Sequence, residues 1–182
     1  MRKILTILFI SLIFSCSEET IPKPKAYLNL QYAKPNYKKL AIKRPYIFLV
    51  PDNTNIKDKK NNWLKIEYPT LKASVDITYR HIQNNLKELL MESQKLVFKH
   101  TQKAEQIMSN DFVDVEKKVF GSIYEITGNA ASQVQFHLTD STQHFIKGAL
   151  YFNVRPNYDS LLPAINYIKK DITKIIETIE WQ

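Results

Sequence analysis

Apolar and polar residues alternate most regularly in the stretch LKASVDITYR, residues 71–80. The apolar residues occupy every second position, and the residues between them are polar or charged: Leu71, Ala73, Val75, Ile77 and Tyr79 are the apolar set. Successive side chains of a strand point to opposite faces, so this pattern predicts a strand with one buried and one wetter face. Such strands are typical of an antiparallel sheet.

Shorter patterns of the same kind predict further strands on both sides of this one. They lie at residues 26–32, 46–50, 62–68, 117–126, 134–140 and 144–154. The last two are expected to form a hairpin through Ser141, Thr142 and Gln143. The polar stretch 52–62 predicts a mobile loop, and the residues between about 103 and 117 predict a polar connector.

Two segments show helical spacing instead. Asn85 is the expected N-cap of a helix that runs to about Lys103, with Glu88 completing a capping box. A stripe of isoleucines from Ile165 to Ile179 predicts a long C-terminal helix, capped by Asp159 or Ser160. The order of elements predicts an α+β fold, a mainly antiparallel sheet packed by an internal helix and a long C-terminal helix.

The first residues predict a lipoprotein. Arg2 and Lys3 precede the apolar run 4–14, which is too short to span a bilayer and is followed by Ser15 and Cys16. We interpret residues 1–15 as a lipoprotein signal peptide, Cys16 as the lipidated residue, 16–25 as a tether and 26–182 as a single domain. The alternative is an ordinary signal peptide with an incidental cysteine. A single cysteine excludes an intramolecular disulfide and a cysteine-based zinc site.

The chain is basic, with a formal net charge of +8. Removal of residues 1–15 leaves 24 basic and 18 acidic side chains. In a secreted protein this charge favours attraction to anionic envelope surfaces, or is an ordinary lysine-rich surface, and we expect no nucleic-acid partner.

Candidate catalytic and metal-binding groups are sparse. His137, which alternates with apolar neighbours and is expected on a polar face, and His144 across the hairpin are the best metal pair, but two ligands make a weak site. Asp140, Ser141 and His144 are too close in sequence for a catalytic triad, and Asp140 is better explained as a turn residue. Paired carboxylates drawn from Glu67, Asp76 and Glu125 are not excluded. We therefore expect no catalytic residues, no metal and no cofactor.

A recognition surface is the better hypothesis. The small-residue segment 128–132 would let a partner approach closely, and Tyr124 and Glu125 precede it. The candidate partner- or ligand-binding residues are Tyr124, Glu125, Gly128, Asn129, Ser132, Asp140, Ser141 and Thr142. The alternative is a strand connection that needs small residues in order to pack.

Several longer strings carry a family resemblance. IPKPKAYLNLQY, KIEYPTLKASVDITY, VFGSIYEITGNAASQVQFHLTDSTQHFIKGALYF and RPNYDSLLPAINYIKKDI together resemble GldD, the gliding motility lipoprotein of the Bacteroidota. The resemblance covers nearly the whole chain after Cys16 and implies a role in gliding, a process linked to the type IX secretion apparatus. The order of elements also resembles the Mog1/PsbP-like sandwich, an analogy that does not fix function.

We therefore expect a non-enzymatic envelope lipoprotein, anchored in a membrane by its lipid and acting through protein partners in the motility and secretion machinery. The outer membrane is favoured, and a periplasmic domain is favoured because the secretion and motility apparatus offers partners there. The cell surface is the alternative, since Glu18 and Glu19 resemble surface-export signals. A small-ligand or carbohydrate-binding module and a cryptic hydrolase are the competing hypotheses.

Overall fold

The computed structural model describes residues 30, 32–99 and 103–182. The signal peptide, Cys16 and the tether lie outside these residues, so their predicted roles stay predictions. The strand expected at 26–32 lies mostly outside them as well, and the two described residues of that range, Leu30 and Tyr32, are not in a strand.

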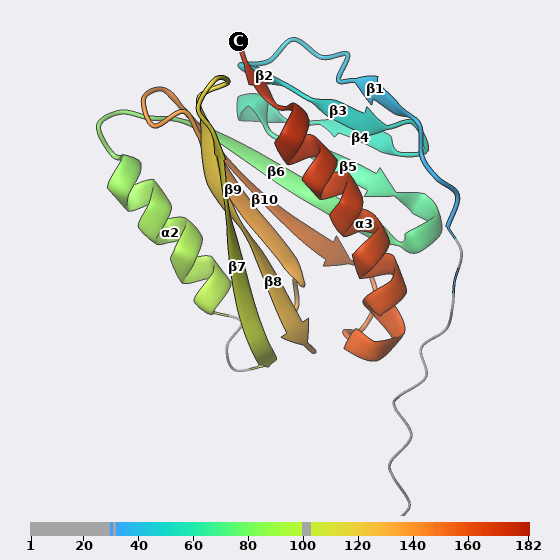
Figure 1. Cartoon of the computed structure of the whole chain (residues 1–182). Coiled ribbons are helices and arrows are strands. Elements are labelled where there is room, and N and C mark those ends of the chain that lie inside the picture. The colour runs from blue at the N-terminus through green and yellow to red at the C-terminus, as the bar shows by residue number, and fades with distance from the viewer. Residues whose placement is uncertain (1–29, 31, 100–102) are drawn as a thin grey trace, which may run out of the picture.

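The described residues form a seven-stranded sheet in which every neighbouring pair is antiparallel. In spatial order its strands are β4 (Asn55–Asp58), β5 (Leu64–Tyr68), β6 (Ala73–His81), β10 (His144–Phe152), β9 (Val134–Thr139), β8 (Val119–Gly128) and β7 (Ala104–Asp114) (Figure 1). Consecutive hairpins build the β7–β10 half of the sheet, and β6 pairs with β10 to join the two halves.

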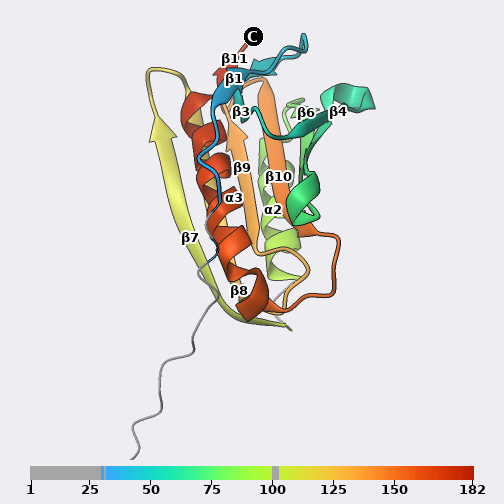
Figure 2. The same ribbon diagram turned by 90° about the vertical axis from the view of Figure 1, so that its right-hand side faces the viewer.

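Two helices and two small sheets complete the domain. The long helix α3 (Tyr158–Thr178) covers one face of the sheet, and α2 (Leu86–Phe98) lies on the other, so the domain has three layers (Figure 2). The paired strands β1 (Tyr37–Lys39) and β3 (Leu49–Pro51) lie beside α3, and β2 (Tyr46–Ile47) pairs with the C-terminal β11 (Glu180–Trp181). Short 3-10 turns at Lys60–Asn62 and Pro69–Leu71 flank β5.

The main core lies between the sheet and α3. It contains the predicted alternating set of β6 together with the isoleucine stripe of α3, including Ile168, Ile172 and Ile175. Gly148 of β10 leaves the space that the Phe136 ring of β9 fills, because an added Cβ would overlap that ring. Full burial of such aliphatic side chains contributes about 1.5–3 kcal/mol each, so this layer supplies most of the hydrophobic stabilisation.

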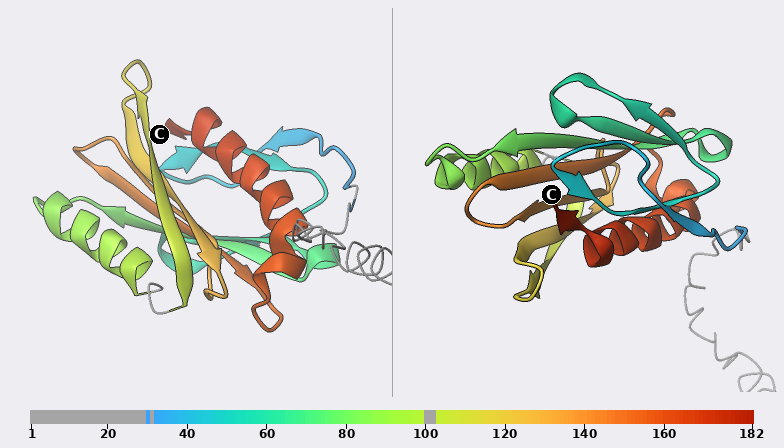
Figure 3. Two further views of the ribbon diagram at one scale, coloured as in Figure 1. Left: turned by 60° about the horizontal axis from the view of Figure 1, so that its bottom comes forward. Right: turned by 90° about the horizontal axis from the view of Figure 1, so that it is seen from above.

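The face under α2 is packed by two smaller clusters. Val97 of α2 lies against Tyr124 and Ile126, and Leu89 lies against Ile82 and Phe145. The sheet is twisted, and the direction of its strands changes progressively from β6 to β7 (Figure 3). β9 runs between both helices and every one of its residues is buried.

The α+β class is confirmed, whereas three local predictions are wrong. The internal helix ends at Phe98, and the expected polar connector contains the eleven-residue strand β7. The predicted loop 52–62 contains β4. Both strands are sheet edges with weakly buried residues, so their sequences lack the alternation that burial of one face imposes.

The helix caps also differ in detail. Asn85 is the N-cap of α2, but its side chain accepts a hydrogen bond from the backbone N–H of Gln83 and does not cap the helix. Asn157 caps α3, and its side chain accepts a hydrogen bond from Ser160 N. The helix therefore begins at Tyr158, whereas a cap at Asp159 would have started it at Ser160. Pro163 consequently lies inside the helix, just beyond its first turn.

Candidate functional site

The eight predicted recognition residues do not form one surface. The small-residue segment 128–132 precedes β9, and the Asp140–Thr142 turn follows it. Because β9 is a six-residue strand, these two groups lie about 20 Å apart, at opposite ends of the sheet. A partner would have to span the whole length of β9 to contact both.

The small residues of 128–132 are engaged in packing. Gly128 has a φ of +88°, and a Cβ there would lie 2.9 Å from backbone atoms of Lys103 and Glu105. Asn129 Oδ1 accepts a hydrogen bond from Tyr158 N at 2.9 Å, at the first turn of α3, and the buried Ser132 hydroxyl donates to Val134 O. This geometry favours the packing interpretation of the segment.

Tyr124 and Glu125 point to opposite faces of the sheet. The Tyr124 side chain is buried beneath α2, where its ring stacks on His137 with 6.0 Å between centroids. Glu125 Oε2 lies 2.9 Å from the ammonium nitrogen of Lys169 on α3. The two residues therefore cannot border one pocket.

The Asp140 carboxylate organises the β9–β10 turn, which confirms the turn interpretation. Its Oδ1 accepts the backbone N–H groups of Thr142, Gln143 and His144, and its Oδ2 accepts the Thr142 hydroxyl. Burial alone would raise its pKa, but these hydrogen bonds stabilise the ionised form and hold the pKa below its ordinary value. Ser141 adopts a φ of +67° at the tip of the turn.

The two hairpin histidines are also separated. His137 stacks between Tyr124 and Phe145 and is buried under α2, so its expected position on a polar face is wrong. Burial lowers its pKa, with Asp111 acting weakly in the opposite direction. His144 lies on the other face, with its Nδ1 2.9 Å from the Tyr79 hydroxyl. Within the described ranges no three potential ligands gather to hold a metal.

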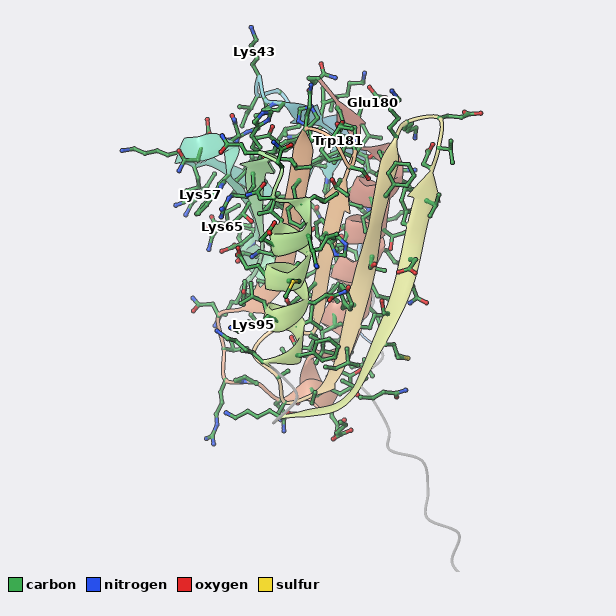
Figure 4. All side chains as sticks on the ribbon, turned by 90° about the vertical axis from the view of Figure 1, so that its left-hand side faces the viewer. Lys43, Lys57, Lys65, Lys95, Glu180 and Trp181 are labelled. Carbon is green, nitrogen blue, oxygen red and sulfur yellow. The ribbon has the colours of Figure 1, made fainter. Side chains whose placement is uncertain are left out.

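Each of the three strand carboxylates is paired with a lysine, and two of these ion pairs are neighbours on β4, β5 and β6. Lys57 Nζ lies 2.8 Å from Glu67, and Lys65 Nζ lies 3.2 Å from Asp76. Both pairs lie on the α2 side of the sheet, in the part that the helix does not cover. Figure 4 shows Lys57 and Lys65 pointing outward beside α2. Glu125 lies on the opposite face with Lys169.

A depression of about 590 Å³ lies near these ion pairs, away from the segment 128–132. Asn55, Glu67, Ser74, Tyr151 and Asn153 contribute to its lining. Tyr151 is the exposed aromatic residue of this group.

A buried acidic residue escaped sequence prediction. Asp171 lies within the isoleucine stripe of α3, is only 1% exposed, and accepts a hydrogen bond from the Tyr37 hydroxyl at 2.6 Å. Burial raises its pKa, and the hydroxyls of Tyr37 and Tyr68 oppose that rise. The Tyr68 hydroxyl and Asp171 Oδ2 nevertheless lack a hydrogen bond of good geometry. The signal in the sequence was an acidic residue at an apolar helix position.

The β7–β8 hairpin is the exposed feature that the sequence did not reveal. Met108 is 40% exposed, Val113 66% and Val115 73%. β7 forms one edge of the sheet and stands clear of α3 at the side of the molecule (Figure 2). Isolated apolar residues are common on protein surfaces, but Val113 and Val115 are near neighbours where the hairpin turns, whereas Met108 lies on the other face of β7.

These observations define a small α+β domain in which Glu125 lies apart from the other strand carboxylates and the two hairpin histidines are separated. Three of its exposed apolar residues lie on the β7–β8 hairpin. In the part of the chain that the structure describes, no helix is long and apolar enough to cross a membrane.

The chain matches the family described as gliding motility lipoprotein GldD over residues 17–181, and it belongs to that family. The match begins directly after Cys16. Membership implies a gliding motility lipoprotein attached to a membrane of the cell envelope. A comparison with curated proteins found no match.

Proposed function

We propose that this lipoprotein serves gliding through protein–protein contacts of its folded domain within the motility and type IX secretion machinery, without a catalytic step of its own. Cys16 carries the lipid, the anchor is in the outer membrane, and the domain faces the periplasm. Stable anchoring requires more than one acyl chain, because a single chain gives only marginal membrane residence.

The observation that carries this proposal is the exposed β7–β8 hairpin. Its apolar residues Met108, Val113 and Val115 face water, while nearly all other large apolar residues of the sheet are covered. Val113 and Val115, at the end of this hairpin, therefore offer apolar contact area to a protein partner. Glu125 lies on the opposite face of the sheet from Glu67 and Asp76, and each of the three carboxylates is paired with a lysine, which supports a non-catalytic role.

The test is a charge substitution on the hairpin in the gliding host. The double variant Val113→Glu, Val115→Glu is expected to abolish colony spreading while protein abundance and membrane fractionation stay unchanged. The matched control is Met91→Glu, Val154→Glu, which changes two exposed apolar residues elsewhere. Normal spreading of the hairpin variant would contradict the proposal.

The side of the membrane has its own test. Protease added to intact cells is expected to leave a periplasmic domain uncut and to degrade it only after the outer membrane is opened. Degradation in intact cells would place the domain at the surface. In that case, replacement of Glu18 and Glu19 by alanine should restore protection if they act as an export signal.

The open depression keeps carbohydrate binding as a second candidate. An exposed tyrosine beside amide, hydroxyl and carboxylate groups suits a sugar, which needs both an apolar contact and several hydrogen bonds. Soluble peptidoglycan fragments should then raise the melting temperature of the wild type but not of Tyr151→Ala. An equal response of both proteins would remove this candidate.

A further inference from the structure

We infer that the free edge of β7 binds an extended, lysine- or arginine-bearing strand of a partner protein by β-strand addition. This inference rests on the proposed function in protein–protein contact and names the surface and the binding mode. Such binding takes its affinity from main-chain hydrogen bonds along a sheet edge. It therefore requires an edge that is long, unpaired and accessible.

The hydrogen-bond register shows which groups of β7 are free. Ile126 N donates to Gln133 O, so Ile126 and every second residue before it in β8 direct their backbone groups toward β9. The intervening residues Glu125, Ile123 and Gly121 bond to their β7 partners, which are Met108, Asn110 and Phe112. The remaining β7 residues direct their N–H and C=O groups away from β8: Ile107, Ser109, Asp111 and Val113.

The strand at the opposite edge of the sheet, β4, has features that protect it from pairing with another chain. β4 has four residues, carries Lys57 in an ion pair with Glu67, and ends at Asp58, which is paired with the buried Arg44. Short, charged edge strands are a common protection against unwanted pairing. β7 has eleven residues with no proline, lysine or arginine, and within the described residues it pairs only with β8.

The charge of β7 indicates the chemistry of its partner. Its charged residues are Glu105, Asp111 and Asp114, all acidic, in a chain whose net charge is +8. Cross-strand pairs of opposite charge stabilise a ladder and like charges destabilise it. A second copy of β7 would place only acidic charged side chains along the shared seam. A basic partner strand is therefore favoured over self-association.

One residue allows the edge to be blocked without breaking the hairpin. Ser109→Pro removes an N–H that points away from β8, and proline is tolerated on an edge strand in that orientation. Ser109→Ala keeps the N–H and is the matched control. Position 109 is exposed, so neither substitution disturbs buried packing. A difference between the two variants therefore reports on the backbone N–H.

The experiment places a photocrosslinking amino acid at Val113 of the full-length lipidated protein in the gliding host. The expected product joins Val113 to an extended, lysine- or arginine-bearing segment of another envelope protein. The Ser109→Pro background should lower its yield at least tenfold, and the Ser109→Ala background should leave it unchanged. If Ser109→Pro fails to accumulate, Asp111→Lys replaces it, with the same tenfold loss expected from charge repulsion.

Three outcomes would overturn the inference: a product that survives the edge variant, a product with a second copy of this chain, or no product from Val113. A parallel crosslinker at the exposed Met91 of α2 separates this inference from the broader proposal. A partner captured from Met91 alone leaves protein–protein contact standing and removes the β7 edge. No product from either position, with normal spreading of the hairpin charge variant, removes both.

Discussion

The two faces of the central sheet are packed in different ways. The face under α3 carries a continuous cluster that runs from β5 through β10 to β9 and includes the isoleucine stripe of the helix. The face under α2 has two small clusters, a stacked Tyr124–His137–Phe145 row, and a polar region with lysine–carboxylate pairs. Alternate residues of the same strands therefore form a continuous apolar core on one face and a mixed, partly polar surface on the other.

This difference indicates where stability and variability lie. Most buried apolar area belongs to the α3 face, so we expect that face to dominate the free energy of unfolding. Substitutions on the α2 face and on the edges should be tolerated more readily. Functional tests on those surfaces can then be interpreted without a large loss of folded protein.

The largest expected effect is the loss of a central side chain on the α3 face. Ile172→Ala removes a fully buried side chain and should lower the free energy of unfolding by about 2–5 kcal/mol. Chemical denaturation measures the change. The exposed neighbour variant Lys170→Ala should stay within about 0.5 kcal/mol of wild type, and equal losses for both would contradict the assignment of the core.

The same kind of truncation on α2 should cost less. Leu89→Ala lies in the smaller cluster with Ile82 and Phe145, where fewer neighbours lose contact, so we expect about 2 kcal/mol. Met91→Ala, on the exposed side of the helix, is its control. A loss at Leu89 larger than that at Ile172 would reverse the comparison of the two faces.

A smaller effect is expected where the β8–β9 connection meets α3. Asn129→Ala removes the acceptor for Tyr158 N, and loss of such a helix-terminal bond costs about 1 kcal/mol. Asn153→Ala, an exposed asparagine outside this contact, should have little effect on the melting temperature. An unchanged melting temperature combined with lost gliding in Asn129→Ala would instead support a recognition role.

The last prediction concerns how the free energy of unfolding depends on pH. Burial raises the folded-state pKa of Asp171 above its unfolded value, so the folded state binds the proton more tightly. This contribution to stability is present at low pH and is lost as pH rises from about 4, the ordinary Asp pKa, through the raised pKa. Relative to wild type, Asp171→Asn should therefore gain stability across that window, as measured by urea denaturation at several pH values. A constant difference would show that Asp171 has an ordinary pKa.

The strongly periodic segments could be predicted from the sequence. β6 and α3 each bury one face against the other, and that burial imposes the period of two on the strand and the 3.6-residue period on the helix. The edges could not be predicted in the same way. β7 exposes residues of both parities, so neither periodicity develops in its sequence.

The candidate site shows the same limit. Tyr124 and Glu125 are adjacent in sequence yet face different layers, and Asn129 and Asp140 lie at opposite ends of β9. Their sequence context indicated small size or turn chemistry but not direction. The Asp140 turn was predictable because its hydrogen bonds are local, whereas the contacts of Asn129 and Asp171 reach α3 and β1 from distant parts of the chain.

The sequence by itself determined the α+β class, the main strands and helices and the family, because local periodicity and family-specific strings are written along the chain. Tertiary structure decided which strands became edges and which part of the sheet α2 left uncovered. It also left the outer backbone groups of β7 without a strand partner among the described residues. The physical reason is that a residue pattern records whether a face is buried. It does not record which distant segment covers that face, and strand pairing over long sequence separations settles that choice.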